Sequence, residues 1–154
     1  MQIDFHHATT YTVARYAGFD HPSANTIAYA AQYVDDAKTS IFLCFDNGMR
    51  YQRRATAHPP EDIHNAIDND ENSQSWLPFH FLPGNAGKPA GDNSGDSYER
   101  RLICLPDSHV ARAMMADVIA TRTAPWGLHR LGIAAHVFAD TSSKSHELLH
   151  THRG

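Results

Sequence analysis

The sequence has only two cysteines, no long apolar run and no excess of basic residues, and each shortage excludes a class of protein. Cys44 and Cys104 lie in separate, largely apolar segments and no CxxC pair occurs, so we expect buried free thiols and no disulfide framework. No apolar stretch approaches the roughly 20 residues that span a bilayer. The N-terminal MQIDFHHATTY lacks a basic segment followed by an apolar one, which predicts a cytoplasmic location.

The chain is mildly acidic. Its 154 residues hold 13 lysines and arginines against 17 aspartates and glutamates, a formal net charge of −4. This balance gives no electrostatic signature for nonspecific nucleic-acid binding, and it does not exclude a small-molecule substrate. Hydrophobic residues make up 42% of the chain, which is enough for one folded domain with a packed core.

Histidine is the residue in excess. Twelve of the 154 residues are histidine, and they are dispersed along the chain rather than gathered in one run. Dispersed histidines suggest metal ligation or acid–base chemistry, although we expect at least half of them to be ordinary surface residues.

Helix and turn signals predict a mainly helical (all-α) single domain over residues 1–154. Residues 40–56 form the exception, because Asn47-Gly48 between two β-rich runs predicts a small hairpin, for which an irregular arm over the helical core is the alternative. In the second helix, Pro22 suits the first turn and Ser23 can act as the cap. The remaining expectations are helices over about 10–17, 22–36, 59–70, 108–122 and 125–141, an extended segment over 75–84 and a mobile loop over 84–97.

Three polar residues share one stripe of the last predicted helix. His136 and Asp140 are four residues apart and His129 precedes His136 by seven, so all three fall on one face beside apolar neighbours such as Val137. This stripe predicts one wall of a metal site. The simpler alternative is a local hydrogen-bonded pair of His136 and Asp140.

Two predicted helices end in carboxylates, which is unfavourable because a helix C-terminus is already negative. Asp35 and Asp36 end the helix over 22–36, and Asp140 lies near the predicted end of the last helix. A cation between these helix ends would make both placements favourable, whereas a solvated helix end explains Asp35 and Asp36 without an ion. Imidazole with carboxylate, without cysteine, favours Zn²⁺ or another divalent transition metal over Ca²⁺.

The pattern H-x3-D-x5-H, formed by His136, Asp140 and His146 after Leu131-Gly132, resembles a known metal-binding core. It is similar to that of the zinc-dependent phospholipase C superfamily, which includes the single-strand-specific zinc nucleases. The stretches DFHH, QYVDD and ADT also resemble an uncharacterised bacterial family. The superfamily's further H-x3-E motif has no counterpart at its usual spacing. The resemblance implies a helical phosphoester hydrolase with a zinc cluster, of which one or two ions are expected here.

The resemblance also implies individual roles. His136 and Asp140 would bind a central ion and Asp140 could bridge two. One histidine between the early helix and the last helix is implied, for which His58 is our choice and His64 and His80 are alternatives. The implied ligands are His6, Asp36 (or Asp35), His58, His136, Asp140 and His146.

The leading hypothesis is a zinc-dependent hydrolase of small phosphoester or phospholipid-like substrates. Asp35 or Asp36 would take the proton from the attacking water. The alternative is a noncatalytic helical protein with a degenerate site that binds a metal or a protein partner. A nucleotide phosphohydrolase of the histidine-aspartate type is disfavoured, because the sequence contains no adjacent His-Asp pair.

Overall fold

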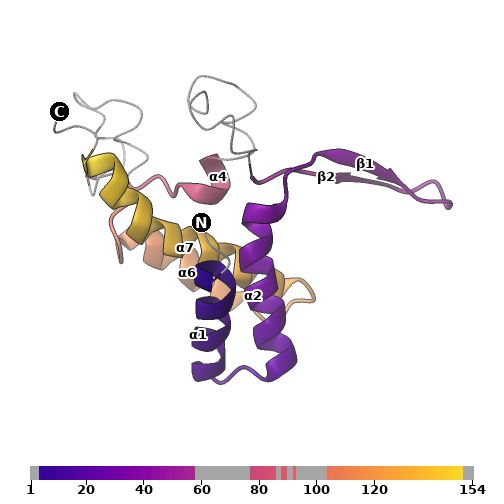
Figure 1. Cartoon of the computed structure of the whole chain (residues 1–154), viewed down its shortest axis with the longest axis horizontal. Coiled ribbons are helices and arrows are strands. Elements are labelled where there is room, and N and C mark those ends of the chain that lie inside the picture. Colours follow the sequence, from indigo (N-terminus) through magenta and orange to yellow (C-terminus); the bar gives the residue numbers. More distant parts are fainter. Residues whose placement is uncertain (1–3, 58–76, 86–87, 90–91, 93–103, 151–154) are drawn as a thin grey trace.

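The computed structural model describes residues 4–57, 77–85, 88–89, 92 and 104–150. The protein is mainly helical, as predicted, with one small antiparallel sheet (Figure 1). None of the helices in these residues is long and apolar enough to cross a bilayer. The elements in chain order are the π-helix η1 (Asp4–Thr9), α1 (Thr10–Tyr16), α2 (His21–Asp36), β1 (Ile41–Cys44), β2 (Arg50–Arg53), α4 (Leu77–His80), α6 (His109–Ala120) and α7 (Gly127–His150).

Two helices begin at side chains that accept hydrogen bonds from the backbone. Asp20 caps α2, since its Oδ1 accepts a hydrogen bond from the Ser23 N–H at 2.9 Å. The expectation that Ser23 is the cap is therefore wrong, because the helix already begins at His21. Ser108 caps α6 by accepting a hydrogen bond from the Ala111 N–H at 3.3 Å.

The contact between α2 and α7 positions the rest of the fold. Small side chains such as Ala28 and Ala31 are fully buried along α2, and α7 presents Gly132 to this surface. A Cβ on Gly132 would lie 2.2 Å from the carbonyl oxygen of Ile27 and 2.7 Å from the Cβ of Ala30. The two backbones approach this closely because Gly132 has no side chain.

Replacing Gly132 by alanine is expected to lower the free energy of unfolding by about 1–3 kcal/mol, because α2 and α7 must shift to admit a methyl group. Ala116→Ser, at an exposed position of α6, is the control and should change stability by less than about 0.5 kcal/mol. Urea unfolding of both variants measures the difference. A Gly132→Ala midpoint equal to that of the unaltered protein would mean that the close approach does not limit packing.

The last helix is longer than the sequence analysis predicted. It continues to His150 instead of ending near Asp140–Thr141. No proline or glycine interrupts residues 141–150, and Lys144, Glu147 and the following leucines are good helix formers. Asp140 therefore lies inside a helix and not at its end.

Two further expectations are corrected, and two fall outside the described residues. Leu77–His80 forms the short helix α4 instead of an extended segment, with Pro78 in its first turn, where proline is tolerated. Cys44 is exposed, not buried, because it lies on the hairpin, whereas Cys104 is buried as expected. The helix expected over 59–70 and most of the loop over 84–97 lie outside the described residues.

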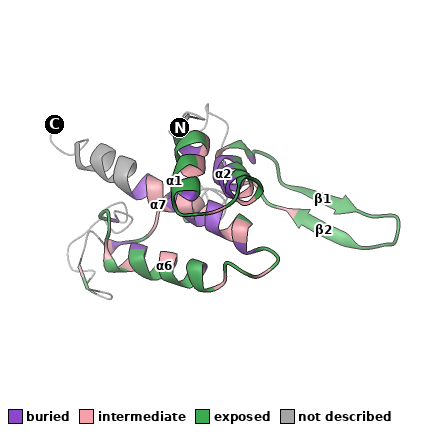
Figure 2. Ribbon diagram, turned by 90° about the horizontal axis from the view of Figure 1, so that it is seen from below, coloured by how far each residue is buried: buried purple, intermediate pink, exposed green. Residues whose placement is uncertain are grey.

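The predicted hairpin over 40–56 is confirmed. β1 and β2 pair antiparallel, with Leu43 opposite Tyr51. In the connecting turn, the Gly48 N–H donates to the Phe45 carbonyl at 2.8 Å, and Gly48 has φ 81°, a left-handed conformation that glycine adopts without strain. The hairpin extends away from the helices, and its surface is almost entirely exposed (Figures 1 and 2).

Candidate metal centre

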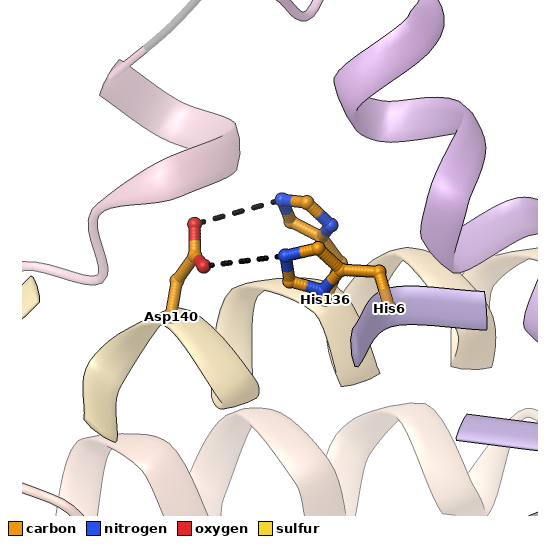
Figure 3. Close-up of side chains that lie close together, drawn as sticks. All are labelled: His6, His136 and Asp140. Atoms are coloured by element: carbon orange, nitrogen blue, oxygen red, sulfur yellow. Dashed lines mark ion pairs between the residues drawn. The ribbon is translucent and has the colours of Figure 1, made fainter. Parts of the chain in front are cut away.

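Five side chains from four helices converge beside the α2–α7 contact. They are His6 from η1, Asp35 from α2, His80 from α4, and His136 and Asp140 from α7. The side chain of Asp35 is 18% exposed, and the other four are buried. Figure 3 shows the imidazoles of His6 and His136 directed at the carboxylate of Asp140. Two overlapping groups within this cluster, His6 with His136 and Asp140, and Asp35 with His80 and His136, could each hold a metal ion.

The face of α7 that touches α2 also carries two of these residues. Gly132, His136 and Asp140 follow one another at intervals of four residues and therefore lie on one face. His136 Nε2 is 3.6 Å from Asp140 Oδ2. His129, which was predicted on the same stripe, is exposed and lies outside the cluster. It precedes His136 by two turns, about 10 Å along the helix axis.

Asp35, and not Asp36, reaches the cluster. Asp35 follows the buried Ala31 by four residues and so lies on the face of α2 that is turned toward α7. Its Oδ1 is 3.8 Å from both His80 Nδ1 and His136 Nε2. Asp36 is rotated by about 100° around the helix axis and is exposed. Of the two aspartates named as alternatives, Asp35 therefore lies in the cluster and Asp36 lies outside it.

A backbone carbonyl sets the orientation of His80. Thr56, on the segment that returns from the hairpin to the helices, accepts a hydrogen bond from His80 Nε2 at 2.9 Å through its carbonyl oxygen. A carbonyl can only accept, so Nε2 carries a proton, and in the neutral tautomer with that proton Nδ1 would offer its lone pair to a metal. That Nδ1 is 3.1 Å from Asp140 Oδ2 and 3.2 Å from His136 Nε2. Metal-ligating histidines are commonly oriented in this way.

His6 is held by ring packing. It lies in the π-helix η1, an element that is frequent at functional sites. Its ring stacks on that of His136 with centroids 3.9 Å apart. Within the part of the chain that the structure describes, neither ring nitrogen of His6 has a hydrogen-bond partner, although the residue is fully buried. Such a buried polar group is costly unless a ligand satisfies it.

Five of the six separations between four candidate ligand atoms are near those of a tetrahedral metal site. A zinc ion with ligands at about 2.0–2.1 Å has ligand atoms about 3.3 Å apart. The four atoms Asp35 Oδ1, His80 Nδ1, His136 Nε2 and Asp140 Oδ2 have five measured separations of 3.1, 3.2, 3.6, 3.8 and 3.8 Å. The second oxygens of both carboxylates face His6, whose Nε2 is 3.7 Å from Asp35 Oδ2 and 3.6 Å from Asp140 Oδ1.

The electrostatics of the cluster also suit a divalent cation. Burial lowers the pKa of His136 from 6.5 to about 4, the neighbouring His6 adds to this effect, and Asp140 opposes it. Burial likewise lowers the pKa of His6, against the attraction of Asp140 and Asp35. Two carboxylates, when ionised beside neutral imidazoles, carry a formal charge of −2. A buried charge of this kind is costly without a compensating cation.

The metal-free protein is expected to lose stability as the pH falls from about 6.5 toward 4. In that interval the unfolded chain binds a proton at His136 that the folded protein, with its lowered pKa of about 4, does not bind. Above the unfolded pKa the two states bind protons equally there and this contribution to the pH dependence vanishes. Urea unfolding in the presence of a chelator at pH 7.5 and pH 5 measures the difference.

Two histidine variants identify the source of that pH dependence. His136→Gln should weaken it, because the titrating group is gone, whereas His109→Gln, at an exposed position on α6, should leave it unchanged. An unaltered pH dependence in the His136→Gln protein would contradict the assignment.

The remaining sequence predictions for the site divide into two kinds. His58, the choice for the intermediate histidine, and its alternative His64 lie outside the described residues, and so does the side chain of His146. Among the described residues, the alternative His80 joins the cluster. No sequence signal identified Thr56, because its contribution is a backbone carbonyl.

Comparison with protein-family models matches residues 1–146 to DUF6765, a family of unknown function. No curated protein and no solved structure matches the chain.

Proposed function

We propose that this chain, which belongs to the DUF6765 family, is a metal-dependent hydrolase of phosphoesters with zinc as its metal. The observation that supports this most is the buried set of Asp35, His80, His136 and Asp140, with ligand-atom separations of 3.1–3.8 Å. The resemblance of H-x3-D-x5-H to zinc-dependent phospholipases C and zinc nucleases supports the substrate class.

The first ion would be held by Asp35 Oδ1, His80 Nδ1, His136 Nε2 and Asp140 Oδ2. A second ion would use His6 Nε2 together with the other oxygens of Asp35 and Asp140, which lie 3.7 and 3.6 Å from it. When bound, a divalent ion lowers the pKa of a coordinated water toward 7 and stabilises negative charge on a phosphoryl group.

Each residue has a role in the proposal that follows from its position. His6 and His136 remain neutral at pH 7 because burial lowers their pKa values, so their lone pairs are available to a metal. Asp140 has one oxygen near His6 and the other near His80, and it would therefore bridge two ions. Asp35 is the partly exposed member of the cluster. With the first ion alone bound, its Oδ2 would stay uncoordinated and would accept the proton of an attacking water as substrate enters from solvent.

Metal analysis and hydrolysis assays test the proposal directly. Protein purified without a nickel column should contain one or two zinc ions per chain and should hydrolyse bis(p-nitrophenyl) phosphate. A chelator should abolish the activity and added zinc should restore it. Less than about 0.2 divalent ions per chain, unchanged in Asp140→Ala, would defeat the proposal, since a mononuclear site needs one ion per chain.

A noncatalytic metal-binding protein is the second candidate, and burial favours it. His6, His136 and Asp140 are at most 1% exposed, as expected for a structural ion that substrate need not reach. In that case zinc would be present and its removal would lower the melting temperature, but no phosphomonoester, phosphodiester or phospholipid would be hydrolysed. The two candidates therefore share the metal analysis and differ in the turnover assay.

A further inference from the structure

The hairpin carries an uncovered apolar face. Side chains alternate between the two faces of a strand pair, so Ile41, Leu43 and Tyr51 share one face. Phe45 and Met49 follow directly, joined by a backbone hydrogen bond of 2.9 Å, and continue that face. All five side chains are between 41% and 62% exposed. A two-stranded hairpin is only marginally stable in water unless something covers its apolar face.

The opposite face of the hairpin is mixed, since Phe42 on it is 68% exposed, and the basic residues gather mainly at the base, where Arg53 pairs with Ile41 on the apolar face. Gln52 and Arg50 lie on the opposite face, as partners of Phe42 and Cys44. Residues 38–54 hold four basic side chains and one acidic, a formal charge of +3 in a chain of net charge −4. The basic side chains are Lys38, Arg50, Arg53 and Arg54. Arg53 lies over the ring of Tyr33, 5.5 Å from its centroid, at the junction with α2.

The area of the apolar face argues against a second copy of the chain as its partner. Five large side chains at about half exposure offer on the order of 500 Å². A stable protein–protein interface buries about 800 Å² on each partner. An anionic lipid surface has no such requirement, since an amphipathic element binds it by apolar burial together with attraction of basic side chains.

We infer that the hairpin is a docking arm for anionic membrane surfaces. The face formed by Ile41, Leu43, Phe45, Met49 and Tyr51 lies against the boundary of headgroups and acyl chains, and the basic residues contact anionic headgroups. The arm projects from the helices, so its face can meet a flat surface without obstruction by them (Figure 1). Asp46 and Asn47 form the tip of the turn, so the arm lies along the surface rather than entering it tip first.

Docking would also determine the position of the metal centre. The hairpin leaves α2 directly after Asp35 and Asp36 and returns at Thr56, whose carbonyl accepts the hydrogen bond of His80. The surface bound by the arm would therefore lie near the exposed edge of the cluster. The docking inference does not depend on hydrolysis and is tested without it.

Cosedimentation with lipid vesicles tests the inference. The full chain should bind vesicles of phosphatidylcholine with 30% phosphatidylserine and bind pure phosphatidylcholine vesicles at least tenfold more weakly, since each basic residue near an anionic surface adds about fivefold to binding. Phe45→Ser should weaken binding to the anionic vesicles about tenfold or more. Phe42→Ser, an equal loss on the opposite face, should leave binding within about twofold. Lys38→Gln with Arg54→Gln, both exposed at the base of the hairpin, should weaken it roughly 25-fold.

Far-ultraviolet circular dichroism measures whether each variant keeps its helices. If Phe45→Ser does not fold, vesicle binding by the variant with two basic residues replaced tests the inference instead. Failure of the unaltered chain to bind anionic vesicles would overturn the inference. Equal losses in Phe42→Ser and Phe45→Ser would also overturn it. So would a dimer in light scattering that Phe45→Ser dissociates, because the apolar face would then belong to an interface between two copies.

Discussion

Asp140→Asn is expected to reduce bound zinc from one or two ions per chain to less than about 0.2 and to reduce phosphodiester hydrolysis by about 1,000-fold or more. Asp140 directs one oxygen at each histidine group: Oδ2 is 3.1 Å from His80 Nδ1, and Oδ1 is 3.6 Å from His6 Nε2. An asparagine amide offers one neutral oxygen in place of two anionic ones, so both proposed ion positions are weakened together.

The stability of the Asp140→Asn protein separates a lost site from a lost fold. Zinc at 1,000 times its Kd should stabilise the unaltered protein by about 4 kcal/mol, or by about 10 °C in melting temperature for a chain of this size. The variant should not show this shift. In chelator it should be as stable as the unaltered protein or more stable, because a buried negative charge has been removed. Zinc content equal to that of the unaltered protein would contradict the prediction.

Asp35→Asn is expected to abolish activity and zinc binding at the first position, whereas Asp36→Asn should leave both within about twofold of the unaltered protein. The two aspartates are adjacent in sequence and equal in chemistry, so each variant is the control of the other. Asp35 is 3.7 Å from His6 and 3.8 Å from His80 and His136. Asp36 is exposed, and its Oδ1 accepts a hydrogen bond from Gln32 Nε2 at 3.4 Å.

Inductively coupled plasma mass spectrometry and hydrolysis of bis(p-nitrophenyl) phosphate measure both effects on the same preparations. If Asp36→Asn lost zinc and Asp35→Asn kept it, the rotational position of the end of α2 would be wrong and the first ion position with it.

The fold could be predicted largely from local patterns. Apolar periodicity was sufficient for α2 and α6, although the cap of α2 was assigned to Ser23 instead of Asp20, and Asn47-Gly48 indicated the hairpin. The end of α7 was missed because Asp140-Thr141 suggested a stop, although no helix-breaking residue follows until Gly154.

The candidate site could be predicted only in part, because half of it depends on how helices pack. The spacing of His136 and Asp140 indicated a shared face, and the structure brings these two together with His6. Choosing between Asp35 and Asp36 required knowing which face of α2 meets α7. Choosing His80 required the path of the chain through α4. Local periodicity contains neither piece of information. Asp140 does belong to the cluster, but it was predicted there as a helix end, whereas it lies inside α7.

Between Gly132 and His136 of α7, the number of residues matters more than their identity, because it fixes the direction in which His136 and Asp140 point. Insertion or deletion of one residue between Gly132 and His136 would turn both ligands about 100° away from the face that meets α2. Substitutions at the intervening positions would preserve their direction. Distant relatives that share this candidate metal centre are therefore better sought with the pattern G-x3-H-x3-D than with H-x3-D alone. An insertion or deletion inside that pattern should exclude a sequence from the search.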